Sequence, residues 1–123
     1  MSDYSYIYID WNFRIVEACL SCFFFREDGW HFAECKELKF LDQGETKNEA
    51  LRNLSNMINA MLLDAISTGK IEKILKELGF KKEKIQIPNR DYYKIQIKLD
   101  KKTILLPVKA YFPVLAGAVV KTG

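Results

Sequence analysis

The most constraining feature of this sequence is a helix start at Thr46. Glu49 follows three residues later, the spacing of a capping box, in which the threonine oxygen accepts the Glu49 amide and the glutamate reaches back to the threonine amide. Apolar residues then recur at steps of three and four. They are Ala50, Leu51, Leu54, Met57, Ile58, Met61, Leu62, Ala65 and Ile66. The pattern predicts one amphipathic helix over residues 46–68, with one side on an apolar surface.

Four candidate strands precede this helix. They span residues 4–11, 13–26, 30–34 and 39–43. The first alternates tyrosine with isoleucine, which predicts a strand or an extended arm, and the apolar density of the second predicts an interior strand. Asp28-Gly29 is a two-residue hairpin signal. The last three candidates therefore predict an antiparallel meander that leads into the helix.

A second, shorter helix is predicted over residues 71–78. Gly69 stands where the left-handed C-cap of the long helix belongs, and Gly79 with Phe80 matches the Schellman end of the short one. The charged residues 81–84 then predict a solvated link.

Period-two alternation returns after this link. It begins at Ile85 and Ile87 and runs to Leu99, and a second run covers residues 103–111. The turn-like residues 100–102 between them predict that the two runs pair as a C-terminal hairpin.

Together these elements predict an α+β fold. We expect a small antiparallel sheet with one long helix on one face, a short second helix and a C-terminal strand pair. The 123 residues suit a single domain, with residues 85–123 as a C-terminal β extension. The apolar tail, residues 113–123, is expected to add a last strand or to dock on another subunit.

Charge is distributed unevenly along the chain. The net charge is +3, yet residues 1–45 hold nine acidic residues against four basic ones, a net charge of −5, and residues 46–123 hold seven against fifteen, a net charge of +8. Two ends of opposite charge suit two different partners. No apolar run approaches the roughly 18 residues that span a bilayer, and the first residues lack a signal-peptide pattern, so we expect a cytoplasmic protein.

The three cysteines do not predict a metal or redox site. Cys19 and Cys22 have CxxC spacing but lie on a predicted strand, where positions i and i+3 point to opposite faces. An odd number of cysteines also argues against a disulfide framework. We therefore expect structural cysteines, and we predict no metal and no cofactor.

Several motifs occur together in an order that resembles the HicB-like antitoxin family. They are Asp28-Gly29, Trp30-His31-Phe32-Ala33-Glu34-Cys35, Gln43-Gly44-Glu45-Thr46 and Glu49-Ala50-Leu51. The resemblance covers residues 13–80. A segment that carries a proline in the family reads Cys35-Lys36-Glu37-Leu38-Lys39-Phe40 here, and the family's C-terminal helix-turn-helix is not visible in this sequence.

The resemblance implies a partial ribonuclease H-like fold, β-β-β-α with a further strand, without nuclease activity. It also implies a partner, a small basic toxin ribonuclease that this domain covers and sequesters. The acidic meander then supplies the partner-binding charge, and the candidate residues are Glu17, Glu27, Asp28, Glu34 and Glu37. Open sheet edges and the apolar tail predict a homo-oligomer, a dimer or a tetramer.

Two alternatives remain open at this point. The first is a nucleic-acid-binding module on the basic C-terminal hairpin, where lysines alternate with aromatic residues. Its candidate residues are Lys94, Lys98, Lys101 and Lys102. The second is an orphan oligomeric family member of another role. A degenerate nuclease that uses Glu17 and Glu49 is the weakest hypothesis, because the capping box already occupies Glu49, and we predict no catalytic residues.

Overall fold

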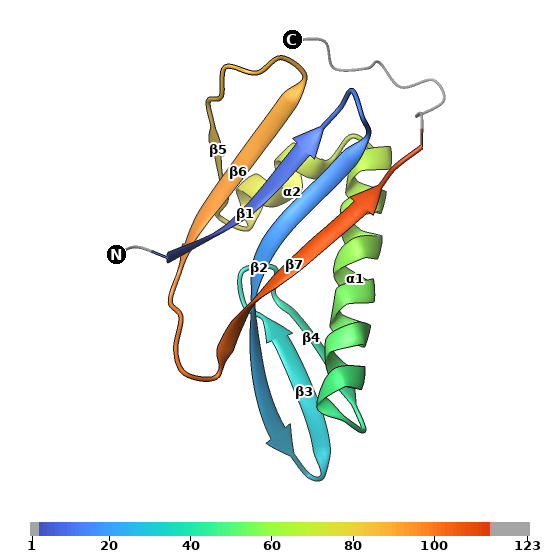
Figure 1. The fold of residues 1–123 in the computed structure, drawn as a ribbon, viewed down its shortest axis with the longest axis vertical. Helices are drawn as coiled ribbons and strands as arrows, with labels where there is room; N and C mark the ends of the chain where they lie inside the picture. The colour runs from blue at the N-terminus through green and yellow to red at the C-terminus, as the bar shows by residue number, and fades with distance from the viewer. Residues whose placement is uncertain (1–2, 114–123) are drawn as a thin grey trace.

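The computed structural model describes residues 3–113 and shows the predicted α+β fold, with two helices and one seven-stranded antiparallel sheet (Figure 1). Residues 114–123, which include most of the apolar tail, lie outside the described residues. In chain order the elements are β1 Asp3–Asp10, β2 Ile15–Glu27, β3 Trp30–Cys35, β4 Phe40–Gly44, α1 Lys47–Ser67, α2 Ile71–Glu77, β5 Lys81–Glu83, β6 Arg90–Ile97 and β7 Thr103–Tyr111.

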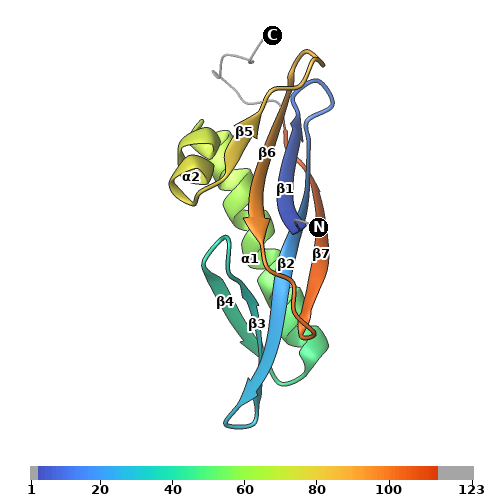
Figure 2. The ribbon, with the colours of Figure 1, turned by 90° about the vertical axis from the view of Figure 1, so that its left-hand side faces the viewer.

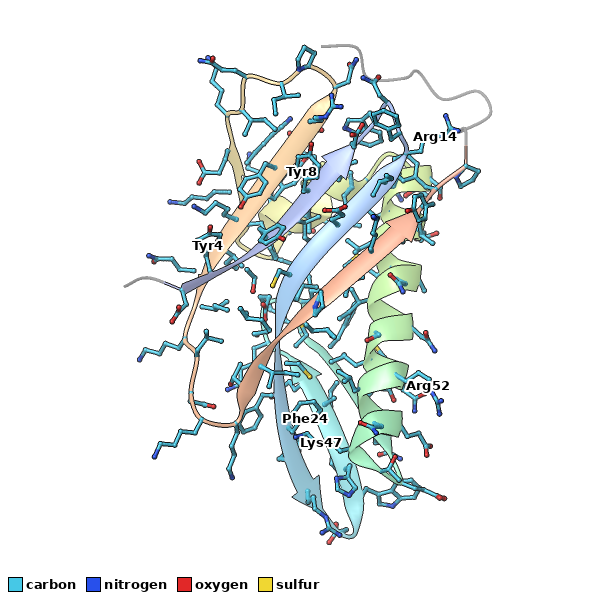
Figure 3. The ribbon with its side chains drawn as sticks, viewed as in Figure 1. Tyr4, Tyr8, Arg14, Phe24, Lys47 and Arg52 are labelled. Atoms are coloured by element: carbon cyan, nitrogen blue, oxygen red, sulfur yellow. The ribbon has the colours of Figure 1, made fainter. Side chains whose placement is uncertain are left out.

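Both helices begin or end as their sequence signals predict. Thr46 is the N-cap of α1, and its hydroxyl accepts the Glu49 amide at 3.1 Å. Gly69 has a positive φ of 71°, and the Lys70 amide donates to the Ala65 carbonyl at 2.8 Å, which closes a Schellman end. The same motif ends α2 at Gly79. At the start of α1, the Lys47 ammonium lies 4.4 Å from the centroid of the Phe24 ring on β2 (Figure 3).

The helices cover one face of the sheet. The apolar side of α1 contributes Leu54, Ile58 and Leu62 to a continuous buried core with Ile7, Val16 and other residues of the inner sheet face. The core extends under α2, where Ile71, Leu75 and Phe80 are buried with Tyr93 of β6. Figure 2 shows α2 and the upper part of α1 on one side of β1 and β6, and the lower part of α1 passing behind β2 in this view. Within residues 3–113, no helix has the length and apolar character that crossing a membrane requires.

The strand order corrects the predicted C-terminal hairpin. β6 pairs with β1 and β5, while β7 pairs with β2, so β6 and β7 are not neighbours in the sheet. The first strand lies between β2 and β6 of its own chain. The alternation of apolar and polar residues identifies a strand but not the strand with which it pairs. Here β6 pairs with the free edge of β1, and β7 pairs with the free edge of β2.

Two smaller predictions for this region were also wrong. Residues 81–83 were expected in a charged link, but they form the short edge strand β5 with all three side chains exposed. Backbone hydrogen bonding at a sheet edge needs no apolar side chain. The three charged residues of β5 therefore carried no apolar alternation from which a strand could be predicted. Ile85 and Ile87 lie in the loop before β6, next to Pro88, which has no N–H for a sheet ladder.

β2 is the strand that connects the two parts of the sheet. Its residues 15–19 pair with both β1 and β7, and Phe23 pairs with both β3 and β7. β1 and β3 therefore follow one another along the same edge of β2, and β7 covers the opposite edge. Figure 1 shows β1 beside one half of this long strand and β3 beside the other.

We predict that Gly44→Ala destabilises the fold. A Cβ at Gly44 would lie 2.5 Å from the backbone nitrogen of Ala50 and 2.9 Å from the backbone carbon of Glu49, so β4 and the first turn of α1 would have to separate. We expect the free energy of unfolding in urea to fall by roughly 2 kcal/mol. The neighbouring Gln43→Ala, at an exposed side chain, should change it by less than about 0.5 kcal/mol. Equal stability of the two variants would show that β4 moves freely.

Candidate functional site

The sheet surface that faces away from both helices, here called the open face, is the candidate functional site. Side chains alternate between the faces of a strand, and residues directly opposite across a ladder share a face. The registers therefore place Tyr8, Glu17 and Lys109 together on the open face, in line with Phe23 and Glu34 farther along β2 and β3.

An aromatic cluster occupies the open face of β2 and β3. Phe25 and Phe32 are directly opposite and stack with ring centroids 4.9 Å apart, and Phe23 lies 5.9 Å from Phe25. Trp30 and Leu41 flank this cluster, with exposed fractions of 40% and 48%. Large apolar side chains that stand exposed next to each other are a feature of protein-binding surfaces.

Three of the predicted acidic residues surround the aromatic cluster. Glu27 is directly opposite Trp30, and Glu34 lies between Phe23 and Leu41 in the ladder. Asp28 is at the tip of the hairpin, where its φ of 52° and the φ of 82° at Gly29 suit a type I′ turn. The structure thus brings Glu27, Asp28 and Glu34 together at one end of the open face.

Glu17 lies apart from these three acids. It is on the open face near the other end of β2, and its carboxylate is 3.6 Å from the Lys109 ammonium of β7. The charge of Glu17 is therefore already paired within the chain.

The prediction that Glu37 faces a partner was wrong. Its side chain is only 7% exposed and fills the gap on the edge of β2 between the end of the β1 ladder and the start of the β3 ladder. The Glu37 carboxylate accepts the backbone amide of Ser21 at 2.7 Å and the hydroxyls of Ser21 and Ser5. Glu37 was expected to be exposed as part of the acidic meander, but the unpaired backbone amide of Ser21 and two serine hydroxyls hold its carboxylate inside the structure.

The four lysines predicted to bind nucleic acid do not form one hairpin surface. Lys94 is on β6, where its ammonium lies 4.0 Å from the ring centroid of Tyr4, a residue of β1. Lys98, Lys101 and Lys102 lie in or beside the connection from β6 to β7. The structure instead brings Lys94 close to the tyrosines of β1. The sequence did not predict this contact, because the residues are far apart along the chain.

The cysteines follow their strand positions. Cys19 pairs with Tyr6 and is partly exposed, whereas Cys22 and Cys35 are buried in the core. Burial, and secondarily the nearby Glu37 carboxylate, raises the pKa of Cys22 to about 11 and raises the pKa of Cys19 and Cys35 as well. Within residues 3–113, no group of three or more histidine, cysteine, aspartate and glutamate side chains is arranged to hold a metal ion.

Comparisons with family models, curated proteins and solved structures found no match to this chain. The function is therefore inferred from the surface itself. The aromatic cluster is the part that sequence reasoning missed, because Phe23 to Phe25 suggested only a buried interior strand. The available signal was the alternation of Trp30, Phe32 and Glu34 opposite them.

We predict that Glu37→Ala lowers the free energy of unfolding by about 3 kcal/mol. Three hydrogen-bond donors, in the interval between the β1 and β3 ladders on the edge of β2, would lose their acceptor. Glu37→Gln, which retains one acceptor oxygen, should cost less. Chemical denaturation measures both. Glu34→Ala is the matched control at a partly exposed position and should stay within about 0.5 kcal/mol of wild type. A Glu37→Ala protein as stable as this control would contradict the role given to the carboxylate.

The raised thiol pKa values predict a loss of stability at alkaline pH. The pKa of Cys22 is raised from 9.0 to about 11 in the folded chain, so the unfolded chain releases this proton first as pH rises. The stability that the protonated Cys22 thiol contributes to the fold is complete below about pH 9 and is lost between about pH 9 and 11. Urea denaturation at several pH values should show a smaller alkaline decline for Cys22→Ala than for wild type. If the stabilities of wild type and Cys22→Ala declined equally with rising pH, the alkaline loss could not be assigned to the Cys22 thiol.

Proposed function

We propose that this chain is a non-catalytic, cytoplasmic binding protein of the HicB-like antitoxin type, with a partial ribonuclease H-like arrangement. In this proposal it sequesters a small basic protein, a toxin ribonuclease, on the β2–β3–β4 part of its open face. The capping motif at Thr46 and the hairpin before it are the features that the family resemblance shares with the observed elements.

The observation that supports the proposal is the composition of this surface. Its centre is the stacked pair Phe25 and Phe32, and Trp30 and Leu41 stand exposed beside it. Glu27, Asp28 and Glu34 form an acidic rim, which is interrupted at Phe23, where the Lys36 ammonium lies 4.8 Å from the ring centroid. An apolar, aromatic centre with a charged rim is the usual anatomy of a protein-binding patch, and tryptophan is enriched among the residues that dominate binding energy.

The acidic rim also specifies the charge of the partner. Acids at the edge of an interface attract a basic protein and accelerate its association. The two acids considered for hydrolysis do not meet: Glu17 is paired with Lys109 on the open face, and Glu49 is in the first turn of α1. This separation favours binding over catalysis.

A charge reversal at the hairpin tip tests this interface. Glu27→Lys combined with Asp28→Asn changes the rim by three charge units, and asparagine tolerates the positive φ at position 28. We expect affinity capture from the native host to recover a small basic protein with the wild-type chain and to lose it with this variant. Adding the wild-type chain to the released partner should inhibit its ribonuclease activity at a fixed stoichiometry.

The control makes the same charge change elsewhere. Asp64→Lys with Glu77→Gln alters two exposed acids on α1 and α2, on the helix side of the sheet, and should leave capture intact. Size-exclusion chromatography of each variant reports whether the homo-oligomer expected from the sequence persists. Capture that survives the rim variant, or a released partner without ribonuclease activity, would contradict the proposed function.

A further inference from the structure

A row of tyrosines occupies the other end of the open face. Tyr4, Tyr6 and Tyr8 alternate along β1, and Tyr92 of β6 is directly opposite Tyr8. The rings of Tyr6 and Tyr92 stack with centroids 5.6 Å apart, and Tyr8 meets Tyr92 edge-on at 6.4 Å. Tyr4, with an exposed fraction of 43%, ends the row. Figure 3 shows Tyr4 and Tyr8 on the side of β1 that faces away from the helices.

Two lysines beside this row are directly opposite each other in the sheet. Lys81 of β5 is directly opposite Lys94 of β6, so both side chains are on the open face. Like charges at directly opposite positions destabilise a sheet. Lys94 also lies over the Tyr4 ring, with its ammonium 4.0 Å from the ring centroid. An anion placed between the two lysines would remove their repulsion right beside the aromatic row.

The other charges on this half of the face are mostly paired within the chain. Arg90 lies 3.2 Å from Asp10, and Lys109 lies 3.6 Å from Glu17. Two acids are directly opposite tyrosines of the row, Glu83 opposite Tyr92 and Glu17 opposite Tyr8. Lys98 follows the end of β6, two residues beyond Gln96, which is directly opposite Tyr4.

We infer that this end of the open face binds single-stranded nucleic acid. Phosphates lie between Lys81 and Lys94, and bases stack on the tyrosine row, the combination that sequence-tolerant single-strand binding uses. Alternate residues of a strand are about 6.8 Å apart, roughly twice the 3.4 Å spacing of stacked duplex bases, so the row suits bases that are splayed apart. This surface is separate from the aromatic cluster, and its occupancy does not depend on the protein partner proposed above.

Fluorescence anisotropy with a labelled oligouridylate of about twelve nucleotides, at low salt, tests the inference. We expect the wild-type chain to bind this probe more tightly than a duplex of the same length. Lys81→Ala with Lys94→Ala should reduce the slope of log affinity against log salt by about 0.7 for each phosphate that the variant no longer neutralises. Tyr4→Leu, which keeps an apolar side chain but removes the ring, should weaken binding roughly fivefold.

The matched control is Lys73→Ala with Lys76→Ala, which removes the same charge from exposed positions of α2 on the helix side. Circular dichroism melting verifies that every variant folds. The inference is overturned if the wild-type chain does not bind at low salt, if its affinity is independent of salt, or if the control weakens binding as much as the β5–β6 pair. It is also overturned if wild type binds no oligonucleotide and Tyr4→Leu converts a dimer into a monomer, which would assign the row to a contact between two copies.

Discussion

The structure depends on one carboxylate, that of Glu37, which accepts the hydrogen bonds left unmade between two strands on the same edge of β2. β1 and β3 share the same edge of β2 but do not meet, so a backbone amide at Ser21 would be buried there without an acceptor. A buried donor without a partner costs free energy comparable to a lost hydrogen bond. Glu37 supplies the acceptor and binds the Ser5 and Ser21 hydroxyls as well, which joins β1, β2 and the β3–β4 connection at one point.

This division gives the open face two chemically different ends. One end carries phenylalanines, a tryptophan and an acidic rim on β2 and β3, and the other carries tyrosines and lysines on β1, β5 and β6. Both ends belong to one sheet supported by the same helix-covered core. The uneven charge of the sequence, acidic up to residue 45 and basic after it, is thus partly preserved as a gradient across a single surface.

Local signals in the sequence predicted local structure well. The cap at Thr46, the Asp28-Gly29 hairpin and the Schellman end of α2 occur where expected, because each depends on residues within one or two turns of chain. The pairing of β6 and β7 could not be predicted in this way. Each strand had several open edges available, and the choice depended on β1 and β2, which lie far earlier in the chain.

The sequence by itself determined the α+β class, the long helix and the alternation that separates a buried sheet face from an open one, since all three follow from short-range periodicity. Only the tertiary structure decided which side chains share a site. It buried Glu37, placed Lys94 over Tyr4, and stacked Phe25 on Phe32. The physical reason is that strand neighbours are chosen by long-range burial and by the need to satisfy backbone hydrogen bonds, and neither quantity is visible in the spacing of residues along the chain.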